Sequence, residues 1–425
     1  MRTLLSVLSL GLLAPMAACN GQQLGGQLVK SRQSRISAAG VDPSVVAAQA
    51  ADNTQLAFDV YAQLKGTPGN LFFSPYSISS AMTMAWAGAA GNTATQMASA
   101  LELNQSPANV LGAFNALDAA LASRGKSGSS EGGGPFQLNV VNAIWTQQGA
   151  PLEAPFLDAL AENFGAGVRT EKFSTAPEAA RADINAWVDD NTGGKIPTLL
   201  QPGTVTPDSR LFLTNAVYFD GSWDSAFDAQ DTKPAPFNAL DGTTPTVQMM
   251  NQTYAGRYSQ SAGWQAIELP YSNNALTLTV IVPDMGQFAS IETQLSATFL
   301  AGVIAAEEQD QITLGLPKFT ATTKADLVPT FKALGLTDAF TSLADFSGID
   351  GAKDLAISAI VHQAVIDVDE KGTKAAAATA VGIGGTSGVA TQKSVTLTID
   401  RPFFIVLRDV PTNTALFVGR LTQLQ

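Results

Sequence analysis

The chain has 425 residues, of which 45% are hydrophobic and 8% aromatic, enough for a sizeable buried core. Its 24 basic and 36 acidic residues give a formal net charge of -12 at pH 7. Nucleic-acid binding draws most of its affinity from clustered Lys and Arg, so this composition argues against nucleic acid as a partner.

Residues 1–18 have the pattern of an export signal. Arg2 precedes an apolar run too short for a permanent membrane span, and small residues lead to Cys19, the only cysteine of the chain. The segment "MAAC" resembles a bacterial lipobox, in which lipid is attached to the cysteine after cleavage; an ordinary signal peptide with an incidental cysteine is the alternative. We therefore expect an exported protein, either lipid-anchored at Cys19 in the cell envelope or extracellular. Asn20 favours the outer membrane over the inner one.

Residues 19–44 are polar, contain Gly and Ser and lack periodicity, which predicts a flexible tether before a single domain over 45–425. Hydrophobic periodicity and residue type then predict the elements of this domain. In chain order they are helices over 45–64 and 77–101, the latter with a Gly-rich break, a strand over 136–147, a helix over 177–196 and strands over 209–223, 275–284, 310–323, 394–409 and 414–424.

Helices dominate the first part of the domain and strands the last part, without regular alternation. This order favours an α+β fold over a wound parallel sheet.

Sequence motifs of catalysis are missing. His362 is the only histidine, and the chain has no HExxH, CxxC or paired-His spacing, no G-x-S-x-G elbow and no dinucleotide or P-loop fingerprint. We therefore expect no metal site and no cofactor, and we interpret His362 as a hydrogen-bonded core residue. A hydrolase that uses His362 is an alternative.

Four segments together resemble the best-marked segments of the serpins and occur in the same order. They are 70–97, 211–223, 362–381 and 400–421; the segments 184–200 and "LPKF" at 316–319 fit as well. The resemblance covers roughly Val45 to the C-terminus. It implies three β-sheets, about nine helices and an exposed reactive-centre loop at about 370–395.

The resemblance also implies two groups of mechanical residues. The shutter cluster, beneath the central sheet where its strands part, would consist of Ser74, Ser77, Asn215 and His362. The breach cluster, at the top of that sheet, would consist of Trp223, Lys318 and Glu370. The resemblance suggests an ion pair between Lys318 and Glu370, with two solvated charges as the alternative.

The loop begins with a hinge that must first be exposed and later fit between packed strands. This hinge comprises Glu370, Lys371, Gly372, Thr373, Lys374, Ala375, Ala376, Ala377, Ala378 and Thr379. Every second residue from Thr373 is small or apolar, and the only charge of the alternate set is Lys374. The hinge therefore suits insertion as a strand; a short helix in the alanine run is the alternative.

Spacing within the family places the scissile bond between Thr386 and Ser387. The loop is longer than in many relatives, so bonds after Val389, Ala390 and Thr391 are alternatives. The surrounding residues are small or β-branched, which suits elastase-like or subtilisin-like enzymes better than trypsin-like ones.

The function implied by the resemblance is irreversible inhibition of serine endopeptidases. The partner would be a target serine protease held in a covalent acyl complex, with cysteine proteases as second targets, and the inhibitor would be a monomer. The alternative is a non-inhibitory serpin that acts as a binding or structural protein.

Overall fold

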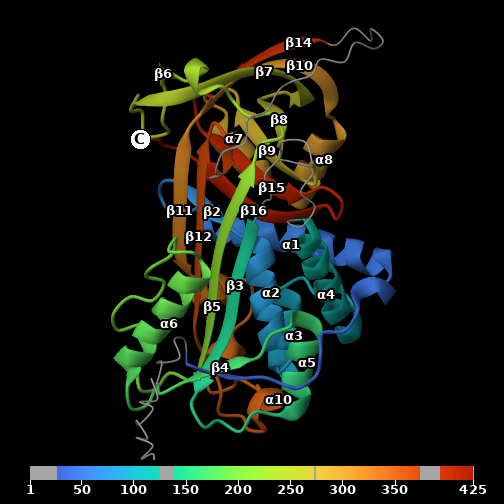
Figure 1. Ribbon diagram of the computed structural model, residues 1–425, viewed down its shortest axis with the longest axis vertical. Coiled ribbons are helices and arrows are strands. Elements are labelled where there is room, and N and C mark those ends of the chain that lie inside the picture. The colour runs from blue at the N-terminus through green and yellow to red at the C-terminus, as the bar shows by residue number, and fades with distance from the viewer. Residues whose placement is uncertain (1–25, 125–136, 272–273, 374–392, 425) are drawn as a thin grey trace, which may run out of the picture.

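The computed structural model describes residues 26–124, 137–271, 274–373 and 393–424, which form an elongated molecule built on two hydrogen-bonded sheets (Figure 1). Helices gather around the lower part, and the strands of the second sheet fill the upper part (Figure 1). This is the expected mixed α and β architecture.

In the described residues the central sheet has seven strands. Their order is β1 (Gln27–Val29), β4 (Val168–Glu171), β3 (Gln137–Gln147), β5 (Leu211–Ser222), β13 (Gly372–Thr373), β12 (Ile357–Asp369) and β11 (Phe319–Asp326). The strands β3, β5 and β12 are apolar on both faces, as in a sheet that is covered on both sides.

Two clusters of buried side chains cover the two faces of this sheet. On one face, Phe212 of β5 packs with Ile184 and Val188 of α6 (Pro177–Asn191). On the other face, Leu213 and Val217 of β5 belong to the main core of the protein. Successive side chains of β5 thus point to opposite faces of the sheet, each face lying against one core. Any strand added beside β5 would therefore meet packed side chains on both faces.

Ten α-helices occur in the described residues. They are α1 (Pro43–Leu64), α2 (Pro75–Trp86), α3 (Gly91–Ala100), α4 (Pro107–Arg124), α5 (Ala154–Phe164), α6, α7 (Phe288–Gln294), α8 (Ala297–Ala305), α9 (Val328–Ala333) and α10 (Ser347–Asp350). No single helix within these ranges is long and apolar enough to cross a membrane; only together do the bent pair α7 and α8 have the length and composition of a span.

The helix predicted over 77–101 is two helices. The chain leaves α2 at Trp86 because Gly88 packs against Ile349 and Phe156: a Cβ at Gly88 would lie 2.4 Å from the Ile349 side chain. Gly91, with φ of 53°, then opens α3. The Gly-rich break predicted from sequence is therefore a corner.

The second sheet has nine strands. Its path is β14 (Ser394–Thr398), β10 (Glu308–Pro317), β7 (Thr246–Ser261), β8 (Trp264–Pro270), β9 (Leu276–Pro283), β15 (Phe403–Asp409), β16 (Thr414–Leu421) and β2 (Leu71–Phe73), and β6 (Lys233–Pro236) pairs with β7. Residues 249–258 of β7 pair with β10, whereas 258–261 pair with β8. Because β7 pairs with both β10 and β8, it joins two of the three expected sheets into one. The described strands therefore form two hydrogen-bonded networks.

Part of the predicted tether is ordered. Residues 27–29 form β1, which pairs antiparallel with β4 at the edge of the central sheet. Arg35 then donates from Nε to Asn115 Oδ1 of α4 at 2.7 Å and from a terminal nitrogen to the Asn163 carbonyl of α5 at 3.2 Å. The expectation of a flexible tether is therefore wrong for the described residues 26–44, because backbone pairing at a sheet edge requires no hydrophobic periodicity.

Candidate functional site

The central sheet is split at its upper end. Strands β5 and β12 pair in parallel from Leu211 with Ile357 up to Tyr218 with Val365. Above this point β13 lies between them and pairs antiparallel with both. Gly372 and Thr373, the first strand-paired residues of the predicted reactive loop, therefore already occupy the position of an additional strand.

Glycine is required where β13 enters the sheet. Gly372 has φ of 147°, and a Cβ on it would lie 2.0 Å from the carbonyl oxygen of Gly221 on β5. Next to it, Thr373 pairs with Gly221 and with Val368 of β12 and is fully buried. The side chain of Thr373 thus lies in the core. The set of every second hinge residue, which was counted from Thr373, therefore begins with a buried side chain.

Trp223 contacts the turn at the upper end of the gap between β5 and β12. Its indole Nε1 donates to the carbonyl of Asp369 at 3.0 Å, and its backbone N–H donates to the carbonyl of Lys371 at 2.9 Å. Its ring stacks on Tyr271 with centroids 4.4 Å apart. The breach residue Trp223 thus holds the turn between β12 and β13.

Lys318 and Glu370, the other two breach residues, form an ion pair with Nζ and Oε2 2.8 Å apart. Thr232 donates from Oγ1 to the other carboxylate oxygen of Glu370 at 2.8 Å. Burial alone would raise the pKa of Glu370, but these hydrogen bonds and one from its own backbone outweigh burial, so the pKa of Glu370 is lowered. The carboxylate is therefore charged near neutral pH and ties the turn to Lys318, which lies between β10 and β11.

The shutter residues meet lower down, where three neighbouring strands and the start of α2 converge. Asn215 of β5 lies directly opposite Asn142 of β3 and directly opposite His362 of β12. Ser74 caps α2 by accepting the Ser77 N–H on its side-chain oxygen at 3.2 Å. The cluster thus joins the seam between β5 and β12 to the helix behind it.

The hydrogen bonds of this cluster form one continuous chain. The His362 ring bonds through Nδ1 to Asn215 Oδ1, and its Nε2 accepts the Ser74 N–H at 3.2 Å. Asn215 Nδ2 donates to Ser77 Oγ at 2.6 Å, and Ser77 Oγ donates to Asn142 Oδ1 at 2.9 Å. These partners assign the proton of the neutral imidazole to Nδ1, since Nε2 faces a donor.

His362 is a structural residue. It is fully buried, and burial lowers the pKa of its imidazole to about 3, so the ring is neutral at physiological pH. Both ring nitrogens of His362 are engaged in hydrogen bonds within the cluster. The alternative of a hydrolase that uses His362 is therefore not supported.

Asn142 belongs to the shutter cluster but is not among the residues predicted from sequence. Its signal is a polar side chain in the otherwise apolar run "VVNAIW", which could have been recognised once β3 and β5 were set in register. Its Nδ2 also donates to the Ser77 carbonyl at 3.1 Å, so Asn142 holds both the backbone and the side chain of Ser77.

Several predicted site residues lie outside the described residues. They are Lys374, Ala375, Ala376, Ala377, Ala378 and Thr379 of the hinge, the cleavage candidates Thr386, Ser387, Val389, Ala390 and Thr391, and Cys19. Within the described ranges, no group of three or more His, Cys, Asp or Glu side chains could hold a metal ion.

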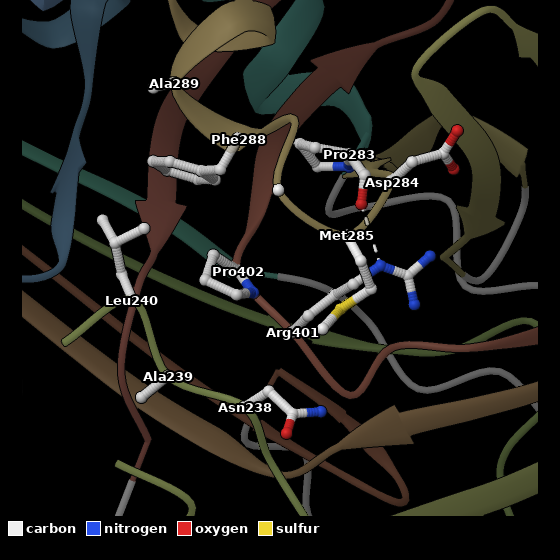
Figure 2. Close-up of a pocket in the computed structure, with 11 residues that line it drawn as sticks. Asn238, Ala239, Leu240, Pro283, Asp284, Met285, Phe288, Ala289, Arg401 and Pro402 are labelled. Carbon is white, nitrogen blue, oxygen red and sulfur yellow. Dashed lines mark hydrogen bonds between the residues drawn. The ribbon is translucent and has the colours of Figure 1, made fainter. Parts of the chain in front are cut away.

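A surface cavity of about 260 Å³ lies apart from these clusters (Figure 2). Arg401 borders it and donates from Nε to the carbonyl of Pro283 at 2.8 Å, and the exposed side chains of Leu240 and Met285 flank it. Its lining shares no residue with the shutter or breach cluster, so we do not count it as part of the site.

Comparison with known proteins agrees with this architecture. The family model Serpin (serine protease inhibitor) matches residues 51–424. A leukocyte elastase inhibitor of Bos taurus is 37% identical over 383 residues, covering 88% of this chain and 98% of the relative. A serpin-like protein of Thermococcus kodakarensis is 36% identical over 364 residues, covering 86% of this chain and 83% of the relative. The crystal structure of the thermophilic serpin Tengpin in its native state has a TM-score of 0.80 at 25% identity, covering 93% of this chain and 98% of that one. The chain therefore belongs to the serpin family.

Proposed function

We propose that this serpin is an irreversible suicide inhibitor of serine endopeptidases. A protease attacks the reactive loop and forms an acyl-enzyme, and the cleaved loop then inserts between β5 and β12 before the ester hydrolyses. The observation that carries this proposal is the pairing of Gly372 and Thr373 with both of these strands. The seam is therefore already open at its top.

Insertion would replace one set of backbone hydrogen bonds, between β5 and β12, with two sets, one on each side of the inserted strand. The parallel pairing of residues 211–218 with 357–365 would be lost, and the inserted strand would pair antiparallel on each side, as β13 does. Each additional ladder bond contributes roughly 0.5 to 1.5 kcal/mol, so a dozen inserted residues release on the order of 10 kcal/mol. That is comparable to the whole stability of an ordinary domain, so the uninserted state is metastable.

The register of β13 specifies what the inserted strand would meet. Thr373 lies opposite Val368 and Gly221, so continuing the antiparallel pairing brings Thr379 opposite His362 and Asn215. A threonine hydroxyl can both donate and accept. In this proposal it replaces the hydrogen bond between His362 and Asn215, which must break when the seam opens.

The proposed target is an elastase-like or subtilisin-like serine protease, with cysteine proteases as second targets. Small residues around Thr386 and Ser387 support this choice. The similarity to a leukocyte elastase inhibitor supports it independently.

The test is incubation with pancreatic elastase and with subtilisin, using trypsin as the matched control. We expect an adduct that survives SDS with the first two enzymes, and mass analysis of the released peptide identifies the cleaved bond. The cleaved inhibitor should unfold at a much higher temperature than the intact one. Cleavage without adduct and without stabilisation would overturn the proposal and favour a non-inhibitory serpin that binds another molecule or serves a structural role.

We further propose that the mature protein is a monomer anchored to the outer membrane by lipid on Cys19, supported by the lipobox-like "MAAC". Radiolabelled palmitate supplied to the producing bacterial cells should label the wild-type protein and not the Cys19→Ser variant. Release of unlabelled wild-type protein into the medium would overturn the lipid anchor.

A further inference from the structure

A single hydrogen bond joins the hinge to the turn that follows β8. The hydroxyl groups of Tyr271 and Thr373 lie 2.7 Å apart, and both side chains are fully buried. Tyr271 comes from the β8 to β9 connection, and Thr373 is the last described residue of the hinge. A contact of this kind between segments distant in sequence fixes where the hinge lies.

The ring of Tyr271 is held on two sides. Trp223 stacks on it, and Phe219 meets it edge-on with centroids 5.0 Å apart and planes at 89°. The absence of a side chain on Gly221 leaves room for it, because a Cβ there would lie 3.1 Å from the Tyr271 ring. The backbone of Tyr271 is fixed as well, since its N–H donates to the Leu276 carbonyl at 2.9 Å. Its hydroxyl is therefore preorganised to meet Thr373.

We propose that Tyr271 is a positioning residue that keeps Gly372 and Thr373 seated in the central sheet before any protease arrives. This inference rests on the proposed inhibitory function. Placing the first residues of a free loop between β5 and β12 costs conformational entropy. The following residues can form stabilising hydrogen bonds with these strands only after that cost has been met. With the hinge seated, insertion proceeds from a strand that has already started.

The same bond also belongs to the inserted state. Insertion adds residues after Thr373 without changing the pairing of Thr373 with Val368 and Gly221. Tyr271 therefore stabilises the intact and the cleaved protein alike, relative to any form in which the hinge has left the sheet. A hinge that is free in the intact protein would gain this bond only after cleavage.

The experiment is a double-mutant cycle with Tyr271→Phe and Thr373→Val, measured as urea unfolding of the intact protein and of the protein cleaved in its loop. We expect each single variant to lower the unfolding midpoint of both forms and the double variant to lower it little further. Thr373→Ser, which keeps the hydroxyl, should resemble wild type. Tyr254→Phe removes a hydroxyl that donates to the Glu268 carbonyl on the second sheet and serves as the matched control. If the two substitutions lower the midpoint additively, or if they are coupled only in the cleaved form, the proposal that the hinge is seated in the intact protein is wrong.

The functional readout is the stoichiometry of inhibition. Tyr271→Phe should raise the number of inhibitor molecules consumed per protease at least twofold, because slower insertion lets more acyl-enzyme hydrolyse, while the adduct still forms. An unchanged stoichiometry together with coupling in the intact form would overturn the role of Tyr271 in insertion. If wild type itself gives no adduct, the inhibitory function fails, and the cycle on the intact form still tests the seated hinge separately.

Discussion

His362 on β12 and Asn215 on β5 lie directly opposite each other, and the hydrogen bond between their side chains crosses the seam that the proposed loop insertion would open. Both side chains are fully buried. Ser77 of α2 and Asn142 of β3 continue the hydrogen-bonded chain from Asn215.

Removing the histidine should destabilise the protein strongly. His362→Ala leaves the Ser74 N–H and Asn215 Oδ1 without partners, at about 1 to 3 kcal/mol for each buried group. The free energy of unfolding in urea measures the loss. Gln363→Ala is the matched control, because the Gln363 side-chain oxygen makes no hydrogen bond. Equal losses in the two variants would contradict the importance of the cluster.

Because the chain has a single histidine, the pH dependence of the unfolding free energy that comes from histidine can be measured separately from that of the carboxyl groups. The unfolded chain binds a proton near pH 6.5 that the folded His362, with a pKa of about 3, excludes. Its contribution to the unfolding free energy is therefore complete above pH 6.5 and is lost below it, by roughly 1.4 kcal/mol for each pH unit.

This comparison requires the variant His362→Gln. Burial raises the pKa of Glu171 and Glu307 to about 7, and these groups stabilise the fold as the pH falls, which is opposite in sign. The difference between wild type and His362→Gln isolates the histidine. A difference that stays constant from pH 7 to pH 5 would refute the assignment.

The ion pair at the turn should hold the turn between β12 and β13 in place. Lys318→Gln leaves the Glu370 side chain with Thr232 alone, so we expect faster loss of inhibitory activity after mild heating. The effect on unfolding free energy should be roughly 1 kcal/mol or less, because the Lys318 side chain is 39% exposed. Lys393→Gln breaks an exposed pair with Glu308 and should change neither property.

The alternation along the hinge can be tested with two arginines. In the proposed inserted strand, the alternation would place Ala375 on the same face as the buried Thr373, so Ala375→Arg should convert the proposed inhibitor into a substrate that is cleaved without forming an adduct. Ala376→Arg lies on the opposite face and should retain most of the adduct. Equal behaviour of the two variants on an SDS gel would argue against insertion in this register.

The sequence predicted β3 and β5 of the central sheet because both strands are long and apolar, whereas it listed no strand over the residues of β12. It did not predict β1, since three residues at a sheet edge gain their order from backbone pairing with β4 and carry no periodic signal. It predicted one broken helix where there are two, because the corner at Gly88 depends on contacts with residues far along the chain.

The site was predicted in part through family resemblance. That resemblance assigned His362 and Asn215 to one cluster, and the structure brings them together. Asn142 and Tyr271 were missed for different reasons. Asn142 is one polar residue in an apolar strand, and only strand register gives it a partner. Tyr271 meets Thr373 through the folding of two distant segments, which no local pattern encodes.

The pairing of β1 with β4 has a consequence for orientation at a membrane. Strand β4 lies at the lower end of the molecule, and β14, which follows the loop, lies at the upper end (Figure 1). Residues 19–26 can span at most about 25 Å. With the proposed lipid on Cys19, the lower end would rest close to the bilayer, and the segments flanking the loop would face outward, toward arriving proteases.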